Sequence, residues 1–276
     1  MIVPIVFLII ISFTDFNLKS LFTGNFGISG FNQYTKIFHS ASFFKTLWRT
    51  VAFMVALVVP TILIGMFMAH FMTMLGKVMK WMLTLAFIFA WAIPNVAAAT
   101  VWNWMFQPRY GIVNIILTRL KIFGNVQDLS WATNPMLAFV CIWLLIVWQA
   151  VPYVTLTLFA ATEQIPPTIF EAARVDGAGS IRAYWSIEFP LLLPVISITT
   201  VLSVIWDFNV FNQIWLISQG GPDEATSTLA IYTYKQAFID FNLSRGAAIS
   251  IIAMLILLAL TSVYVIMLMR NNEGLS

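Results

Sequence analysis

Long apolar runs separated by short polar segments dominate the chain. Four intervals without Asp, Glu, Lys or Arg are each long enough for a membrane-spanning helix, because a hydrocarbon core needs about 20 apolar residues. These intervals are Thr50–Leu75, Trp81–Pro108, Leu129–Thr162 and Gly246–Met269. A fifth run, Phe189–Ile217, contains one acid at Asp207, and a sixth opens the chain at Met1–Phe13. The pattern predicts an all-α membrane protein with six transmembrane helices.

The opening run is shorter than the other five. A helix of this length rises only about 20 Å. The run also lacks the basic region and small-residue cleavage site of a secretory signal. We therefore expect the first helix to be truncated at its start.

Composition supports the membrane class and excludes other classes. Hydrophobic residues make up 61% of the chain and charged residues 9%, against roughly 25% charged in soluble domains. Cys141 is the only cysteine and His39 and His70 are the only histidines, so we expect no disulfide and no metal site. The net charge is +3, but the basic residues are scattered, so nucleic acid is not an expected partner.

One charged, glycine-containing segment, Glu171–Pro194, lies between two apolar runs. Its pattern predicts an amphipathic helix, a turn at Gly177–Gly179, and a second helix with Ser180 as N-cap and Pro190 at its end. Such a helix pair is suited to docking against another protein. The alternative is a helix that lies flat at the membrane interface.

The same segment resembles the EAA loop of ABC importer permeases. The residues in the family's register are Glu171, Ala172, Ala173, Asp176, Gly177, Ala178, Ile187, Pro190 and Pro194. The stretches SGFNQYTKIF, SQGGPDEATSTLAIYTYKQAF and GAAIS resemble permeases of the maltose type, so the resemblance covers almost the whole chain. It departs at the N-terminus, where the family's basic lead and full first helix are missing.

The resemblance implies a single transmembrane permease domain over residues 1–276, with a cytoplasmic coupling loop at 163–190. It implies ATPase-coupling roles for Glu171, Ala172, Ala173, Asp176, Gly177 and Ala178. No P-loop pattern occurs in the sequence, so we expect no enzymatic activity and no cofactor in this chain. ATP and Mg would bind to two cytoplasmic ATPase subunits. A second homologous permease subunit and an extracytoplasmic solute-binding protein would complete the importer in the cytoplasmic (inner) membrane of a prokaryote.

The distribution of positive charge disagrees with this orientation. Five basic residues share the side of the predicted coupling loop, and nine lie on the other side. The five are Lys77, Lys80, Arg174, Arg182 and Arg270. The positive-inside rule would place the loop outside. The resemblance instead implies that the loop and the C-terminus are cytoplasmic, and we adopt that orientation.

Polar and aromatic residues within three spans are candidates for a solute pathway. Asp207 is the one acid within a span, and Ser203 lies one helical turn before it. Pro152 and Pro94 each interrupt backbone hydrogen bonding near an aromatic side chain. The resemblance implies sugar contacts at Trp91, Asn95, Gln149, Tyr153, Ser203 and Asp207. Packing of the aromatic residues, and a structural carboxylate held by Asn209, Asn212 or a neighbouring helix, remain open alternatives.

The sequence therefore predicts the permease subunit of an ATP-driven importer for a sugar or related polyol. The alternative is an ion-coupled secondary transporter that uses Asp207 as its coupling group. A membrane-embedded enzyme is a weaker third possibility, since no second acid or nucleophilic pair accompanies Asp207 within the spans.

Overall fold

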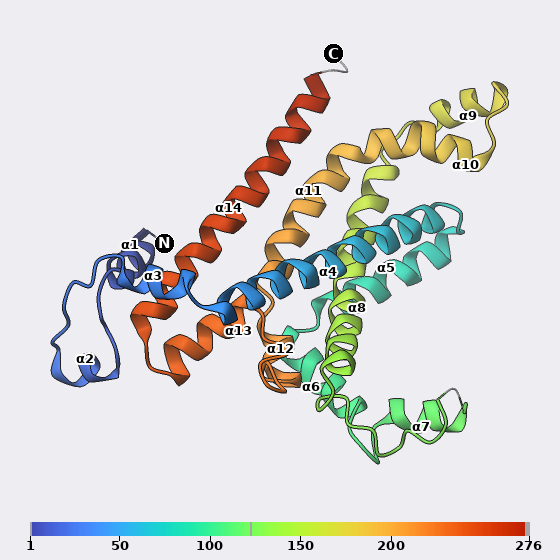
Figure 1. Ribbon diagram of the computed structural model, residues 1–276. Helices are drawn as coiled ribbons and strands as arrows, with labels where there is room; N and C mark the ends of the chain where they lie inside the picture. The colour runs from blue at the N-terminus through green and yellow to red at the C-terminus, as the bar shows by residue number, and fades with distance from the viewer. Residues whose placement is uncertain (1, 122, 274–276) are drawn as a thin grey trace. The chain divides into compact units, whose positions relative to one another are not determined.

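The computed structural model describes residues 2–121 and 123–273, and these residues are helical or irregular, with one isolated β-bridge between Thr14 and Ile28. Figure 1 shows the elements in chain order. The first half contains α1 (Ile2–Ser12), α2 (Leu18–Thr23), α3 (Asn32–Phe38), α4 (Ala41–Thr73), α5 (Lys77–Ala92), α6 (Asn95–Met105), α7 (Ile112–Arg119) and α8 (Pro135–Thr162). The second half contains α9 (Pro167–Val175), α10 (Ser180–Ala183), the π-helix η1 (Tyr184–Glu188), α11 (Phe189–Phe208), α12 (Asn212–Ile217), α13 (Leu229–Tyr234), the π-helix η2 (Lys235–Ile239) and α14 (Leu243–Glu273).

Four helical segments of the described chain are long and apolar enough to cross a membrane. They are α4, α8, the run Ser180–Ile217 and the Leu243–Ile266 part of α14. The pair α5 and α6 makes a fifth if it is counted as one span, and α1 is a shorter apolar helix. The prediction of an all-helical membrane protein is confirmed.

The third predicted span is bent by 94° between α5 and α6, so the interruption expected at Pro94 is present. Pro94 lacks a backbone N–H and disfavours helical torsions in the residue before it. Ile93 accordingly has φ −65° and ψ 125°, which are extended values. The break therefore has a local cause in the sequence.

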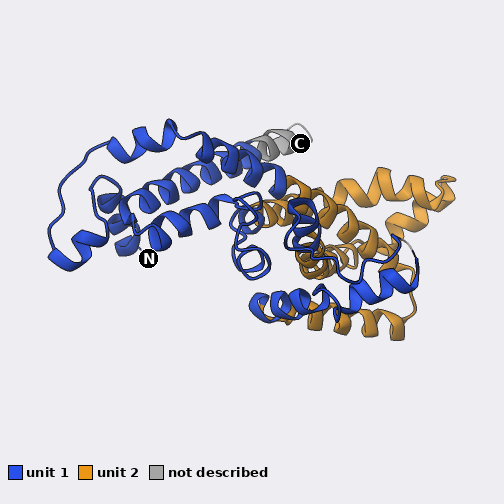
Figure 2. Ribbon diagram, turned by 60° about the horizontal axis from the view of Figure 1, so that its bottom comes forward, with its two compact units in different colours: residues 1–54, 95–142, 205–276 blue, residues 55–94, 143–204 orange. Residues whose placement is uncertain are grey.

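The chain forms two compact units, and their boundaries fall within α4, α8 and α11 and between α5 and α6 (Figure 2). One unit comprises residues 1–54, 95–142 and 205–276. In this unit α14 packs against α1, α3, α13 and η2, and α12 packs against α6. Its fully buried side chains include Phe43, Phe208, Ile214, Leu229 and Ile249.

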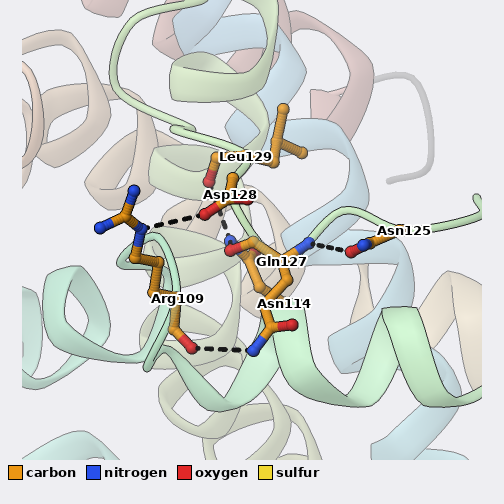
Figure 3. Close-up of polar contacts among 6 residues, drawn as sticks. All are labelled: Arg109, Asn114, Asn125, Gln127, Asp128 and Leu129. Carbon is orange, nitrogen blue, oxygen red and sulfur yellow. Dashed lines mark hydrogen bonds and ion pairs between the residues drawn. The ribbon is translucent and has the colours of Figure 1, made fainter.

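A polar network orders the connection between α6 and α8 in this first unit (Figure 3). The side chain of Asn114 on α7 is fully buried, and its Nδ2 donates to the backbone oxygen of Leu129 at 2.8 Å. Its Oδ1 accepts from Trp131 Nε1 at 2.6 Å. Arg109 Nε donates to Asp128 at 3.1 Å. These side chains satisfy backbone and polar groups that have no partner within a helix.

The second unit comprises residues 55–94 and 143–204. A Cβ added at Gly65 on α4 would lie 2.8 Å from Val154 Cβ on α8, so a side chain at position 65 would clash. Trp143 on α8 donates its Nε1–H to the backbone oxygen of Ala56 at 2.6 Å. That oxygen lies four residues before Pro60, which has no N–H to donate to it. Trp143 thus satisfies the carbonyl that Pro60 leaves free.

Proline does not end the other helices of this unit. Pro152 lies inside α8, which continues to Thr162, and Pro194 lies inside α11. A continuous helix here agrees with the known tolerance of membrane helices for proline when neighbouring groups satisfy the freed carbonyls.

Candidate functional site

The predicted helix pair is present at residues 167–188 of the second unit. Pro166 is the N-cap of α9 and Pro167 is its first residue, a position where the missing N–H has no cost. In Figure 1, α9 and α10 lie next to each other beyond the ends of α8 and α11.

The turn after α9 is a Schellman motif. Ala178 N–H donates to the backbone oxygen of Ala173 at 2.9 Å, and Gly177 N–H donates to Arg174 at 3.1 Å. Gly177 has φ +80°, a left-handed conformation that glycine adopts without steric strain. The turn predicted at Gly177–Gly179 is confirmed.

Both predicted boundaries of the second helix are wrong. The N-cap is Gly179, not Ser180, and no side chain caps this end. The helix does not end at Pro190 but continues through η1 into α11. In η1 the Phe189 N–H donates to Tyr184 O, one residue further back than in an α-helix. This wider turn just before Pro190 gives the proline ring room that a regular α-helix would not.

The six candidate coupling residues differ in exposure. Glu171, Ala172, Asp176 and Gly177 are exposed, Ala178 is half-buried and Ala173 is buried. Ala173 therefore supports the turn through its backbone, while the exposed residues are free to meet another molecule.

The surface of the α9–α10 helix pair combines charged side chains with exposed apolar side chains. Within the described residues, the charged side chains Glu171, Arg174, Asp176 and Arg182 form no ion pair. Val175 is 88% exposed and Ile181 is 79% exposed. Large apolar side chains beside unpaired charges are typical of an interaction surface.

Three of the six candidate pathway residues meet in the second unit. The Trp91 ring of α5 stacks on the Tyr153 ring of α8, with centroids 5.8 Å apart and an interplanar angle of 26°. Gln149 Nε2, one turn before Tyr153, donates to the backbone oxygen of Ile93 at 2.8 Å. Gln149 is buried and Trp91 is half exposed. The stacked rings of Trp91 and Tyr153 thus lie beside the break between α5 and α6, and the side-chain amide of Gln149 stabilises this break.

The other three candidates lie on α6 and α11. Asn95 is exposed at the first residue of α6. Ser203 and Asp207 are buried one turn apart on α11. Their helical face does not extend to Gln213, because α11 ends at Phe208 and Gln213 belongs to α12.

Asp207 is not held by the amide that the sequence suggested first. Asn209 Nδ2 donates instead to the backbone oxygen of Ile205 at 2.9 Å. Asp207 Oδ2 is buried and forms no hydrogen bond within the described part of the chain. A buried carboxylate oxygen of this kind is a typical feature of functional sites in membrane proteins.

Sequence reasoning missed a contact between the partly exposed His70 on α4 and the buried Glu188 on η1, whose Nδ1 and Oε2 lie 3.0 Å apart. The sequence carried a signal for it, since His70 is the one titratable residue in Thr50–Leu75 and Glu188 directly precedes an apolar run. No group of three or more His, Cys, Asp or Glu gathers as metal ligands among the residues that the structure describes.

Apolar spans, a broken helix pair and an exposed helical hairpin define an integral membrane protein of the transport class. Residues 61–272 match the family model described as binding-protein-dependent transport system inner membrane component, and the chain belongs to this family.

Named relatives and a solved structure agree with this membership. The chain is 36% identical over 264 residues to the diacetylchitobiose uptake system permease protein DasB of Streptomyces coelicolor, covering 96% of this chain and 80% of DasB. It is 31% identical over 261 residues to the sulfoquinovosyl glycerol transport system permease protein SmoG of Agrobacterium fabrum, covering 95% of this chain and 82% of SmoG. Its fold matches a crystal structure of a bacterial ABC transporter involved in import of the acidic polysaccharide alginate, with TM-score 0.80, 19% identity, and coverage of 87% and 84% of the two chains.

Proposed function

We propose that this chain is the permease subunit of an ATP-driven importer that moves a sugar or related polyol across the cytoplasmic membrane by alternating access. The observation that carries the proposal is the exposed α9–α10 hairpin, with its unpaired charges, in a chain of this transport family. DasB and SmoG, which are named for carbohydrate substrates, support the substrate class.

The proposed topology has six spans in one permease domain over residues 1–276. They are α1, α4, the bent pair α5–α6, α8, the run Ser180–Ile217 and α14. Residues 163–190 form the coupling loop on the cytoplasmic side. With an even number of spans, both ends of the chain lie on that side as well, and residues 274–276 fall outside the described part.

The partners follow from the proposed mechanism. Two cytoplasmic ATPase subunits bind ATP and Mg, and one of them receives Glu171, Ala172 and Asp176 of the hairpin. The turn built on Ala173, Gly177 and Ala178 orients these residues. A second homologous permease subunit supplies the facing half of the pathway, and an extracytoplasmic solute-binding protein delivers the sugar.

The sugar pathway uses residues that can offer both an apolar face and hydrogen bonds. The rings of Trp91 and Tyr153 suit the C–H face of a sugar, while Asn95, Ser203 and Asp207 can bond to its hydroxyl groups. Gln149 has its Nε2–H already committed to Ile93, so its role is to hold the helix break beside the rings. An ion-coupled transporter that uses Asp207 is not favoured, because the family depends on binding proteins.

The test is uptake by the complete complex in liposomes, with ATP inside and the solute-binding protein outside. Tyr153→Ala and Asp207→Ala should each reduce uptake by about two- to tenfold, as expected for one aromatic or polar contact, while the ATPase subunits still co-purify. Phe89→Ala, an exposed aromatic on the same helix as Trp91, is the matched control and should transport normally. ATP-independent uptake by this chain alone would contradict the proposal. Loss of assembly in the two variants would assign them a structural role.

A further inference from the structure

Glu188 lies where three elements meet at the end of the coupling loop. Its Oε2 accepts a hydrogen bond from His70 Nδ1 of α4 at 3.0 Å, and its Oε1 lies 3.5 Å from Thr162 Oγ1 of α8, whose single hydroxyl proton is donated to the backbone oxygen of Leu158 at 3.0 Å. The His70 ring meets the Tyr184 ring edge-on, with centroids 4.6 Å apart. The Glu188 side chain is 5% exposed. One carboxylate on η1 is thus bonded to the last turn of α4 and lies beside the last residue of α8.

The other end of the loop carries a second carboxylate contact, which is much more exposed. Glu163 Oε1 accepts from Lys80 Nζ of α5 at 2.8 Å, and the side chains are 51% and 25% exposed. Exposed ion pairs are screened by water and contribute little. A buried carboxylate, in contrast, loses much of its stabilisation when a partner is removed. Of the two carboxylate contacts, the one at Glu188 is shielded from water, so it is the one able to transmit movement between the elements that it joins.

The position of Glu188 in the chain determines which helix this contact can couple to the hairpin. The helix from Ser180 runs without a break through η1 into α11, so a displacement of the hairpin passes directly into α11. That route does not include α4, whereas α8 is already joined to the hairpin by residues 163–166 of the chain. The bond from Glu188 to His70 adds a lateral link from the loop to α4.

We propose that Glu188, held by His70, is a positioning residue that makes the end of the coupling loop move together with α4. The inference rests on the proposed function and deepens it. Loss of the link leaves the hairpin able to bind the ATPase, but its movement no longer reaches the whole of the second unit. ATP is then hydrolysed without a matching amount of transport.

The experiment uses the complete transporter in proteoliposomes and measures solute molecules imported per ATP hydrolysed, together with the yield of folded complex. His70→Phe keeps a ring against Tyr184 but leaves the carboxylate without its donor, so both yield and ratio should fall. Adding Glu188→Gln to that variant removes the stranded charge and should restore the yield. The ratio should stay about tenfold below wild type, since a buried charge-assisted bond is still missing. Recovery of both quantities would show a purely structural role and overturn the inference.

Two further variants complete the test. His70→Gln retains an N–H donor and should keep most of the wild-type ratio. Comparison of His70→Gln with His70→Phe therefore tests whether the hydrogen bond to Glu188 supports coupling, even if complexes that carry Glu188→Gln cannot be isolated. Glu163→Gln, the exposed control, should leave the ratio unchanged; an equal loss there would overturn the special role of Glu188.

The inference and the proposed function fail in different ways. A wild-type complex that imports no solute on ATP would overturn the proposed function, and the inference with it. ATP-driven uptake with an unchanged ratio in the double variant His70→Phe with Glu188→Gln would overturn the inference alone.

Discussion

At the scale of single residues, the turn between α9 and α10 depends on one backbone conformation. Gly177 has φ +80° and Gly179 has φ −70°, while a Cβ at either position would meet no atom within 4 Å. The two positions therefore differ in the backbone conformation that a substituted residue must adopt, and not in available space. They form a matched pair for mutation.

We expect Gly177→Ala to uncouple ATP hydrolysis from transport and Gly179→Ala to have little effect. An alanine at position 177 adds about 1 kcal/mol of left-handed strain, enough to shift the population of the turn by about fivefold. The measurement is solute imported per ATP in the assembled transporter. Equal ratios for the two variants would show that the conformation of the turn is not what matters.

Residues near this turn also show how far sequence reasoning reaches. A glycine after an amphipathic helix identifies the turn, because the left-handed requirement is local. Ser180 as N-cap and Pro190 as helix end were wrong, although both residues have the matching local preference. The wider turn of η1 accommodates Pro190, and no residue preference indicates a π-helix at Tyr184–Glu188.

At the scale of elements, prolines inside long helices need partners from neighbouring helices. The backbone oxygens of Ala56 and Ile93 receive side-chain donors from Trp143 and Gln149 on α8. A single helix thus stabilises both the intact α4 at Pro60 and the break between α5 and α6. Unsatisfied carbonyls in a membrane would otherwise cost several kcal/mol each.

Trp143→Phe should lower the thermal stability of the protein in detergent, because the freed carbonyl of Ala56 loses its donor at a cost of about 1–3 kcal/mol. Pro60→Ala in the same background supplies a backbone N–H to that oxygen and should recover most of the loss. The midpoint of thermal unfolding measures both effects. A neutral Trp143→Phe, or a double variant less stable than the single one, would contradict this account.

At the scale of the whole molecule, the orientation of the chain is the property on which two signals disagree. The count of basic residues places the coupling loop outside, and the family resemblance places it inside. The native Cys141 is buried and therefore shielded from a labelling reagent, so a cysteine introduced at an exposed position is the thiol that such a reagent detects.

Ser180→Cys should resist a membrane-impermeant thiol reagent in right-side-out vesicles and react in inside-out vesicles. Asn125→Cys, exposed in the connection between α6 and α8, is the opposite-side control and should show the reverse pattern. Mass spectrometry of the labelled protein gives the result. Labelling at position 180 in right-side-out vesicles would reverse the proposed topology.

The sequence by itself determined the membrane class, the places of the long apolar helices and the exposed hairpin at 167–188. These properties depend on sums of local hydropathy and on short-range backbone preferences, which are written in consecutive residues. Only the tertiary structure decided which distant side chains meet: Gln149 with Ile93, Trp143 with Ala56, and Glu188 with His70. The partners in these contacts lie 56 to 118 positions apart, and their pairing depends on how helices pack, which no local pattern encodes.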